Sequence, residues 1–327
     1  MTRIPITPDP GSRNGSPPLL EIRNLKVHFP DDTGPVKAVD SIDLIVREKE
    51  CFGIIGESGS GKTVLCLAIL GLLAGDASFS GEIIFKGENL FSMSSRKIRK
   101  IRGKEIGAIF QNPATSLDPV FTIGDQLSEA LIRGEGFSKA EVNTNLILLL
   151  DRVSIRDPAL RIRQYPHELS GGLRQRVMIA MGIAAAPSLI IADEPSSGLD
   201  LRIKRRIISL LQDISRNASM FIVTHDLELA EKLFETLAVM YAGEIVEIAD
   251  CKEFFKAPMH PFSEGLLNSL PSRGMQPIPG SSPSLTALPE GCRFFPRCRY
   301  AMEICKNKHP ELFHVMGKRQ VRCFKYA

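Results

Sequence analysis

Short apolar runs separated by turn residues dominate the first third of the chain. Polar and apolar positions alternate over residues 20–29, which predicts an edge strand, and residues 36–46 predict the second strand of the same hairpin. An all-apolar run at residues 52–55 predicts a buried strand that leads directly into a helix over residues 63–73. Two further strands are predicted at residues 81–85 and 106–110. These elements indicate an α/β fold.

Helical periodicity replaces the strand signals between about residues 113 and 187. Helices are predicted over residues 120–133, 139–153 and 172–185. We therefore expect a helical subdomain inserted into the α/β core. Buried strands return at residues 189–192 and 221–224, and a closing hairpin is predicted over residues 237–248.

The two ends of the chain differ in composition from the rest. Residues 1–18 contain five prolines and lack the apolar core of a signal peptide, which predicts a disordered tail before a main domain over residues 19–257. After Pro258 proline is again frequent, and four cysteines fall within the last 36 residues. Residues 258–327 are therefore expected to form a separate small module.

Bulk composition narrows the class of partner. Hydrophobic residues make up 43% of the 327 residues but aromatic residues only 6%, which suits a parallel sheet rich in Val, Ile and Leu. The 41 basic and 37 acidic residues leave a net charge of +4, which does not argue for nucleic acid or acidic lipid. Because no run of 18 apolar residues occurs, we expect a cytosolic protein whose membrane attachment comes through a partner.

Six basic residues crowd the segment from Arg96 to Lys104. Such a cluster can contact nucleic acid or anionic lipid, but it lacks the interleaved aromatic residues that single-strand binders use. Ile98 and Ile101 are spaced as core contacts of a helix. We therefore interpret this cluster, and the similar one at residues 202–206, as solvent-exposed helix faces.

Residues 56–63 fit the phosphate-binding pattern GxxxxGK[ST]. Glycines allow consecutive backbone N–H groups to point into one concavity at a helix N-terminus, which makes an anion-binding nest. The Lys62 ammonium is expected to contact the β- and γ-phosphates, and the Thr63 hydroxyl to ligate Mg²⁺. The predicted ATP-binding residues of this loop are Gly56, Glu57, Ser58, Gly59, Ser60, Gly61, Lys62 and Thr63.

Two carboxylates follow the apolar strand at residues 189–192. Asp193 and Glu194 emerge at the carboxyl end of this strand, which is where ligands bind in open α/β sheets. Asp193 is expected to hold Mg²⁺, partly through water. A single acidic pair after a strand is also common as a solvated turn, so the assignment depends on the accompanying motifs.

The segment Leu169–Gly172 (LSGG), followed by Gln175 and Arg176, resembles the signature of ATP-binding cassette (ABC) ATPases. The resemblance implies a P-loop NTPase fold with a RecA-like core, an antiparallel β subdomain and a helical subdomain. In that family two cassettes sandwich two ATP molecules, and each signature caps the ATP on the partner's phosphate loop. The chain is therefore expected to act as a dimer. The residues expected to act in trans are Ser170, Gly171, Gly172 and Gln175.

The same resemblance assigns roles to five other positions. Glu194 resembles the general base for the attacking water, and His225 resembles the switch histidine that reads the γ-phosphate. Gln111 resembles the Q-loop residue that contacts Mg²⁺ or water and links the core to the helical subdomain. Asp200 resembles the D-loop residue that crosses the dimer interface. Phe29 is expected to stack on adenine, with an ordinary edge-strand aromatic as the alternative.

Four cysteines near the C-terminus form a candidate metal site. Cys292, Cys298, Cys305 and Cys323 are spaced more widely than the usual zinc ligands, and a reducing cytosol argues against disulfides. Four thiolates can bind either Zn²⁺ or an iron–sulfur cluster. From the residues alone a cluster, zinc and four unligated thiols all stay open.

The C-terminal segment indicates a particular subfamily of ABC ATPases. Together with His260-Pro261-Phe262 and Ile278-Pro279-Gly280, the cysteine segment resembles the tail of oligopeptide/dipeptide-type ABC importer ATPases, some of which carry a [4Fe–4S] cluster there. The resemblance thus favours a [4Fe–4S] cluster over zinc. It covers about residues 20–327, and the segment Gln111–Pro119 is specific to this subfamily.

The resemblance implies an ATP-hydrolysing subunit at the cytoplasmic face of the bacterial inner membrane. Its expected partners are a second ATPase subunit, identical or different, two transmembrane permease subunits and an extracellular or periplasmic solute-binding protein, with no nucleic acid. Peptides are the expected cargo, with nickel, glutathione or another solute as alternatives. The alternative of another class is a soluble ABC ATPase that acts on ribosomes or DNA. Such proteins usually carry two cassettes or a long coiled-coil insertion, and this chain has neither.

Overall fold

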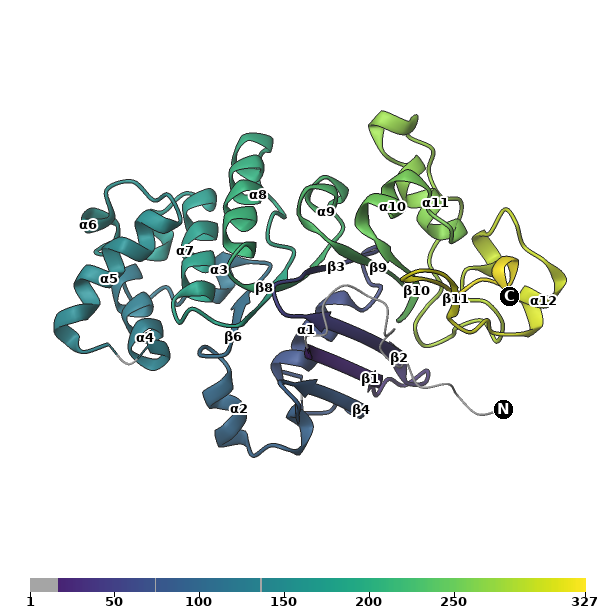
Figure 1. Ribbon diagram of the computed structural model, residues 1–327, viewed down its shortest axis with the longest axis horizontal. Helices are drawn as coiled ribbons and strands as arrows, with labels where there is room; N and C mark the ends of the chain where they lie inside the picture. The colour runs from purple at the N-terminus through teal and green to yellow at the C-terminus, as the bar shows by residue number, and fades with distance from the viewer. Residues whose placement is uncertain (1–16, 74, 136) are drawn as a thin grey trace.

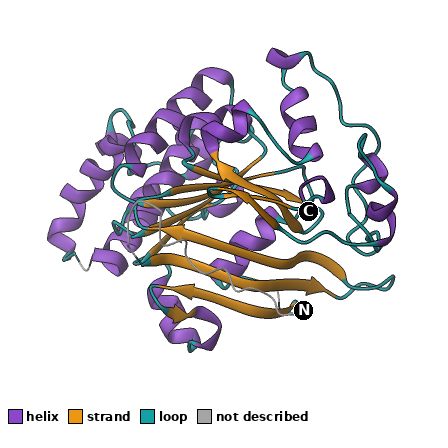
Figure 2. Cartoon of the chain, turned by 45° about the vertical axis from the view of Figure 1, so that its right-hand side comes forward, coloured by secondary structure: helices purple, strands orange, loops and turns teal. Residues whose placement is uncertain are grey.

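The computed structural model describes residues 17–73, 75–135 and 137–327 (Figure 1). Most of the tail predicted for residues 1–18 lies outside the described residues, and Pro18 already belongs to the first strand. Two sheets form separate layers with helices around them (Figure 2). Within the described residues, no helix is both long enough and apolar enough to cross a bilayer.

The smaller sheet is antiparallel and has the strand order β2-β1-β4-β5. Its first two strands form the predicted hairpin, in which Phe29 pairs with Val36 beside the turn. Alternate residues of β1 are buried, which explains the period-2 pattern of the sequence. The strands are β1 (Pro18–Phe29), β2 (Val36–Arg47), β4 (Ser78–Phe85) and β5 (Glu88–Asn89).

The larger sheet has eight strands in the order β11-β12-β10-β9-β3-β8-β7-β6. Strands β9, β3, β8, β7 and β6 run parallel, and β3, β7 and β8 are completely buried, as their continuous apolar runs predict. Because the parallel strands share one direction, their carboxyl ends meet at one edge of the sheet. The strands are β3 (Cys51–Ile55), β6 (Ile106–Ile109), β7 (Leu189–Asp193), β8 (Ser219–Thr224), β9 (Thr236–Tyr241) and β10 (Glu244–Asp250).

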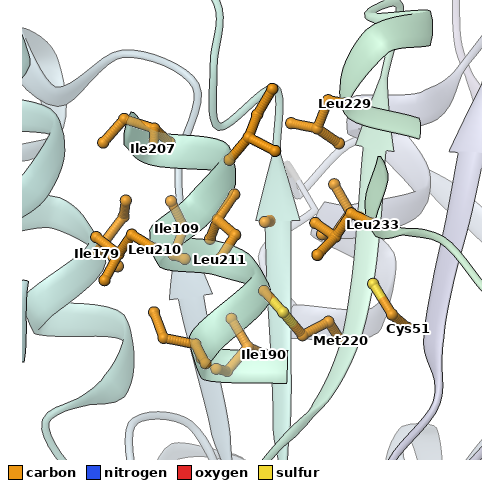
Figure 3. Close-up of a cluster of buried hydrophobic side chains, with 14 of the residues drawn as sticks. Cys51, Ile109, Ile179, Ile190, Ile207, Leu210, Leu211, Met220, Leu229 and Leu233 are labelled. Carbon is orange, nitrogen blue, oxygen red and sulfur yellow. The ribbon is translucent and has the colours of Figure 1, made fainter. Parts of the chain in front are cut away.

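Helix α1 (Lys62–Leu70) lies between the two sheets and contacts β2, β7 and β8. On the other face of the central sheet, α8 (Leu201–Ser215) and α9 (Leu227–Leu233) bury an apolar cluster (Figure 3). Ile207 and Leu211 of α8 meet Ile190 and Met220 of the sheet in this cluster. This packing fixes the direction in which β7 and β8 present their carboxyl ends.

The predicted helical subdomain is confirmed as a helical region at one end of the molecule (Figure 1). Its central helices α4, α5 and α7 contact one another, and α7 also packs on β6, which joins the region to the sheet. The helices are α3 (Pro113–Ser116), α4 (Ile123–Glu135), α5 (Lys139–Arg152), α6 (Pro158–Arg161) and α7 (Gly171–Ile183).

The C-terminal segment is joined to the cassette more closely than a separate module would be. Its hairpin extends the central sheet, because β12 (Arg319–Val321) pairs with β10 and with β11 (Phe313–Met316). The rings of Phe262 and Phe294 pack on Tyr241 at the end of β9. Helix α10 (Cys251–Lys256) precedes this segment, and α11 (Pro261–Asn268) and α12 (Glu303–Asn307) lie within it.

Candidate functional site

The phosphate-binding loop connects β3 to α1 and depends on two close backbone contacts. A Cβ atom on Gly61 would lie 2.0 Å from the Ala38 carbonyl oxygen, and one on Gly56 would lie 2.2 Å from the Met240 carbonyl oxygen. Gly61 also has φ +106°, a conformation that favours glycine. These positions therefore require glycine for the loop to keep its shape before the helix.

Lys62 lies at the centre of this loop. Its side chain is buried, and Nζ donates hydrogen bonds of 2.9 Å to the carbonyl oxygens of both Gly56 and Glu57. Burial lowers the pKa of Lys62, and the nearby charges of Glu194 and Asp193 oppose that shift. The loop thus holds one cation next to the backbone N–H groups at the start of α1, which suits a phosphate group.

Asp193 at the end of β7 fits a divalent cation. The residue is 6% exposed, and among the described residues its Oδ1 atom has no hydrogen-bond partner. Burial raises the pKa of Asp193, and a hydrogen bond from Thr63 opposes the shift. A buried carboxylate oxygen without a partner, beside a hydroxyl group, is a ligand set that Mg²⁺ accepts. Gln111 follows the end of β6 at the same edge of the sheet and is exposed.

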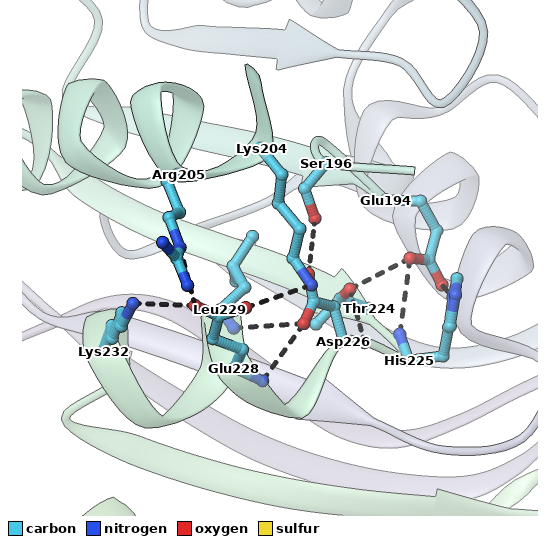
Figure 4. Close-up of polar contacts among 10 residues, drawn as sticks. All are labelled: Glu194, Ser196, Lys204, Arg205, Thr224, His225, Asp226, Glu228, Leu229 and Lys232. Atoms are coloured by element: carbon cyan, nitrogen blue, oxygen red, sulfur yellow. Dashed lines mark hydrogen bonds and ion pairs between the residues drawn. The ribbon is translucent and has the colours of Figure 1, made fainter. Parts of the chain in front are cut away.

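Residues at the end of the neighbouring strand β8 hold the Glu194 side chain in place (Figure 4). Its Oε1 atom lies 2.8 Å from Nδ1 of His225, and its Oε2 atom accepts a hydrogen bond of 2.9 Å from the Thr224 hydroxyl. Glu194 has φ +48°, which is uncommon for a residue other than glycine, and its backbone N–H donates to the Val223 carbonyl oxygen. His225 is 62% exposed. The carboxylate and the histidine therefore form one unit that faces solvent through the imidazole.

A second set of contacts extends from this unit to α8 (Figure 4). Asp226 accepts a hydrogen bond from Ser196 at 2.9 Å, and its Oδ2 atom lies 2.7 Å from Nζ of Lys204. Its backbone N–H donates to the Thr224 hydroxyl. No motif of the sequence indicated a role for Thr224 or Ser196. Lys204 belongs to the cluster at residues 202–206 that was predicted to be solvent-exposed, but its side chain is only 22% exposed because it pairs with Asp226. Asp226 is the N-cap of α9, so its position before that helix could have indicated a cap but not these partners.

The signature residues divide into two groups. Ser170 is the N-cap of α7 and is exposed together with Gly171. Gly172 is buried, and a Cβ atom there would lie 2.9 Å from the Ile203 side chain. The prediction that Gln175 acts in trans needs correction: its side chain is 1% exposed and donates a hydrogen bond of 2.8 Å to the Pro195 carbonyl oxygen of its own chain.

Two other predicted residues lie at the edges of the site. Asp200 is exposed and caps α8, where its carboxylate accepts hydrogen bonds of 3.0 Å from the N–H groups of Arg202 and Ile203. Phe29 is half-buried at the end of β1 and packs on the core beneath the small sheet. Its proposed stacking on adenine stays a prediction.

A groove of about 1290 Å³ lies between the core and the helical region, next to the Q-loop. Arg99, Lys100 and Arg102 line one side, at the end of α2 (Ser95–Ile101). Asp125 and Glu129 of α4 line it as well. The basic cluster is thus an exposed helix face, as predicted. The groove is lined by positive charges from the end of α2 and by negative charges from α4.

The predicted metal centre at the C-terminus is not supported. Cys292 and Cys305 are joined by a backbone hydrogen bond of 2.8 Å, and burial raises the pKa of Cys292 to about 12. However, no group of three or more His, Cys, Asp or Glu side chains that could hold a metal ion occurs in the described part of the chain, which includes all four cysteines. The predicted [4Fe–4S] cluster and the zinc alternative are therefore unsupported among the described residues.

Comparison with known proteins identifies the family to which this chain belongs. Residues 39–197 match the model of the ABC transporter family, and residues 246–305 match that of the oligopeptide/dipeptide transporter C-terminal region. The chain is 41% identical over 314 residues to the oligopeptide transport ATP-binding protein OppD of Salmonella typhimurium, covering 94% of this chain and 93% of that protein. It is 43% identical over 313 residues to the dipeptide transport ATP-binding protein DppD of Haemophilus influenzae, covering 93% and 94%.

Among solved structures, the chain resembles the ATP-binding cassette MJ0796 in a dimeric post-hydrolysis state bound to ADP and Pi. The TM-score is 0.65 at 26% sequence identity, covering 71% of this chain and 98% of that cassette. The P-loop fold and the ATP site described above agree with this similarity. The chain therefore belongs to the ABC transporter ATP-binding proteins of the oligopeptide/dipeptide type, and it is an ATPase.

Proposed function

We propose that this protein is the ATP-hydrolysing subunit that powers peptide import across the bacterial inner membrane and binds peripherally at the cytoplasmic face. The observation that carries the proposal is the combination, in one chain, of an ABC transporter cassette and a C-terminal region of the oligopeptide/dipeptide type. The names of the relatives, oligopeptide and dipeptide transport proteins, favour peptides over nickel, glutathione or another solute. They also favour a transporter over a soluble ABC ATPase that acts on ribosomes or DNA.

The geometry supports a division of labour at the ATP site. Lys62 and the backbone N–H groups of residues 58–63 bind the phosphates. Thr63, Asp193 and Gln111 would hold Mg²⁺, which would supply positive charge to the phosphates. Glu194 orients the attacking water and accepts its proton, and His225 holds the Glu194 carboxylate in place through the 2.8 Å contact.

A second cassette completes each ATP site. Ser170 and Gly171 are exposed at the start of α7, where a helix N-terminus can cap the phosphates of an ATP on the partner. Asp200, the D-loop residue, is also exposed, and it precedes α8. ATP then holds two cassettes together, identical or different, and hydrolysis releases them.

The groove beside the Q-loop is the proposed docking site for one of the two permease subunits. Phe121 is 53% exposed and lines this groove together with the charged residues of α2 and α4. An exposed aromatic ring between two sets of charges suits a short amphipathic segment of a permease. A solute-binding protein outside the membrane delivers the peptide to those permeases.

Reconstitution tests the proposal. The chain is combined in proteoliposomes with the permeases and the second ATPase encoded beside its gene, with Mg-ATP enclosed in the lumen. Uptake of labelled di- to pentapeptides is then measured with the peptides and the solute-binding protein outside. We expect uptake that requires ATP and is lost with Glu194→Gln. Uptake of nickel or glutathione but not of peptides would reject the proposed cargo, and ATPase activity that the permeases do not alter would reject the transport role.

A further inference from the structure

The C-terminal segment contacts the phosphate-binding loop directly through Arg297. The guanidinium group donates bidentate hydrogen bonds to the Glu57 carboxylate, from Nη1 at 2.9 Å and from Nη2 at 3.0 Å. The two residues are 240 positions apart, and the Arg297 side chain is 5% exposed. The Glu57 side chain is 29% exposed, so the pair is partly buried, and its bidentate geometry fixes the orientation of the carboxylate.

The surroundings of Arg297 are built to hold it in this position. Its Nε atom donates to the Pro279 carbonyl oxygen at 2.9 Å, and its guanidinium group lies 5.8 Å from the centre of the Tyr241 ring. Ser282 donates a second hydrogen bond to Glu57. The ion pair is thus part of a packed contact rather than an isolated surface pair.

A second arginine of the same segment reaches the loop by another route. Arg293 donates a hydrogen bond of 2.6 Å to the Ala242 carbonyl oxygen in the β9–β10 turn and also contacts Asp40. In that turn the Gly243 N–H donates to the Ser60 carbonyl oxygen at 3.0 Å. The C-terminal segment therefore supports the loop both at Glu57 and at Ser60.

Charge explains why Glu57 needs a partner. Its carboxylate belongs to the loop that receives the triphosphate, and it lies close enough to Lys62 for the two charges to interact. Without compensation this negative charge would oppose the phosphates and weaken the effect of Lys62. Arg297 supplies the compensating charge from the C-terminal segment, through its two hydrogen bonds to Glu57.

We infer that Arg297 is a positioning residue of the ATP site, which holds and neutralises Glu57 so that the phosphate-binding loop accepts ATP. In this way the C-terminal segment sets the affinity of the cassette for nucleotide. The inference rests on the ATP site and not on the identity of the transported solute.

Calorimetric titration of the full-length chain with Mg-ATP and with Mg-ADP tests the inference. Arg297→Met is expected to raise the Kd for ATP by about tenfold, because it leaves one negative charge in the loop. The double variant Glu57→Gln/Arg297→Met removes both charges and should return the Kd to within about threefold of the wild-type value. The matched control is Arg299→Met, since Arg299 is 56% exposed, pairs with Glu264 and should leave the Kd unchanged.

A purely structural role for Arg297 would not be relieved by Glu57→Gln, so a double variant as weak as Arg297→Met overturns the inference. An Arg297→Met protein that binds ATP within twofold of wild type also overturns it. If Arg297→Met does not fold, as judged by circular dichroism, Glu57→Gln alone decides: it should lower the Kd by about threefold and steepen its dependence on salt. An unchanged or higher Kd for Glu57→Gln would contradict the inference. Failure of the wild-type chain to bind ATP would instead reject the ATP site itself.

Discussion

Two glutamates of the ATP site are held by different parts of the chain. Glu194 at the end of β7 is held by Thr224 and His225, which lie at the end of the neighbouring strand β8. Glu57 in the phosphate-binding loop is held by Arg297, from a segment that follows the cassette in the chain. The groups that hold the catalytic glutamate thus lie within the cassette, whereas the loop that binds phosphate depends on the C-terminal segment.

The largest effect is expected at the catalytic glutamate. Glu194→Gln should keep ATP binding and lower kcat by at least about a hundredfold, because the amide cannot accept the proton of the attacking water. Phosphate release in the presence of Mg-ATP measures this, with Glu231→Gln on the exposed face of α9 as the control. Hydrolysis near the wild-type rate would remove Glu194 from the proposed role.

The signature should matter for assembly and not for binding. Gly171→Asp places a carboxylate on an exposed N-terminus where a Cβ atom meets nothing within 4 Å, so the fold should persist while ATP-driven dimerisation is lost. Light scattering of Glu194→Gln protein with and without Gly171→Asp measures this, and Gly75→Asp, also in open space, is the control. Gly172 is less suitable, because a side chain there would meet Ile203. Dimer formation that survives Gly171→Asp would argue against a capped ATP.

A smaller effect is expected for the histidine beside Glu194. His225→Ala removes the 2.8 Å contact but leaves the Thr224 hydroxyl and the His225 backbone N–H on the carboxylate. We expect kcat to fall by about tenfold to a hundredfold, less than for Glu194→Gln, with ATP affinity retained. A loss as large as that of Glu194→Gln would show that His225 does more than hold the glutamate.

The smallest effect should come from the contact that links this unit to α8. Lys204→Met removes a partly buried ion pair with Asp226 and should lower the free energy of unfolding by about 1 kcal/mol at neutral pH. Burial raises the pKa of Asp226, but the hydrogen bond from Lys204 and others lower it below its ordinary 3.8 overall. The stabilisation is therefore present above that value and lost as the pH falls through the folded-state pKa, where wild type and variant should converge in urea denaturation.

Arg205→Met is the matched control for that measurement. Arg205 is 64% exposed, and its Nε atom lies as far as 4.0 Å from the Glu228 carboxylate, so this pair should contribute little. The stability of Arg205→Met should equal that of the wild type at every pH. A gap between wild type and Lys204→Met that widens as the pH falls would contradict the role given to the pair.

Local motifs predict the parts of this molecule that depend on nearby residues. The P-loop glycines, Lys62 and the carboxylates after β7 were identifiable because a strand, a loop and a helix follow one another in the chain. Gln175 was assigned wrongly, because whether a helix residue faces a partner or its own core depends on packing that the motif does not contain. The metal centre was expected from the resemblance of the C-terminal tail to importer ATPases, but a resemblance in sequence does not specify how four side chains are oriented.

Arg297 shows the same limit at longer range. Nothing in the residues around it distinguishes it from the exposed arginine two positions later. Its role follows from the pairing of β12 with β10 and the packing of Phe294 on Tyr241, which bring the C-terminal segment next to the phosphate-binding loop. Contacts that depend on this long-range arrangement became visible only in the structure.

Steady-state ATP hydrolysis by four proteins tests the contrast between the two glutamates most directly: wild type, Glu194→Gln, Arg297→Met and the combination. Glu194→Gln should lower kcat with little change in KM, and Arg297→Met should raise KM about tenfold with kcat within about twofold. A fall in kcat at unchanged KM for Arg297→Met would contradict the account, because it would place the C-terminal segment in the hydrolysis step and not in the binding of ATP.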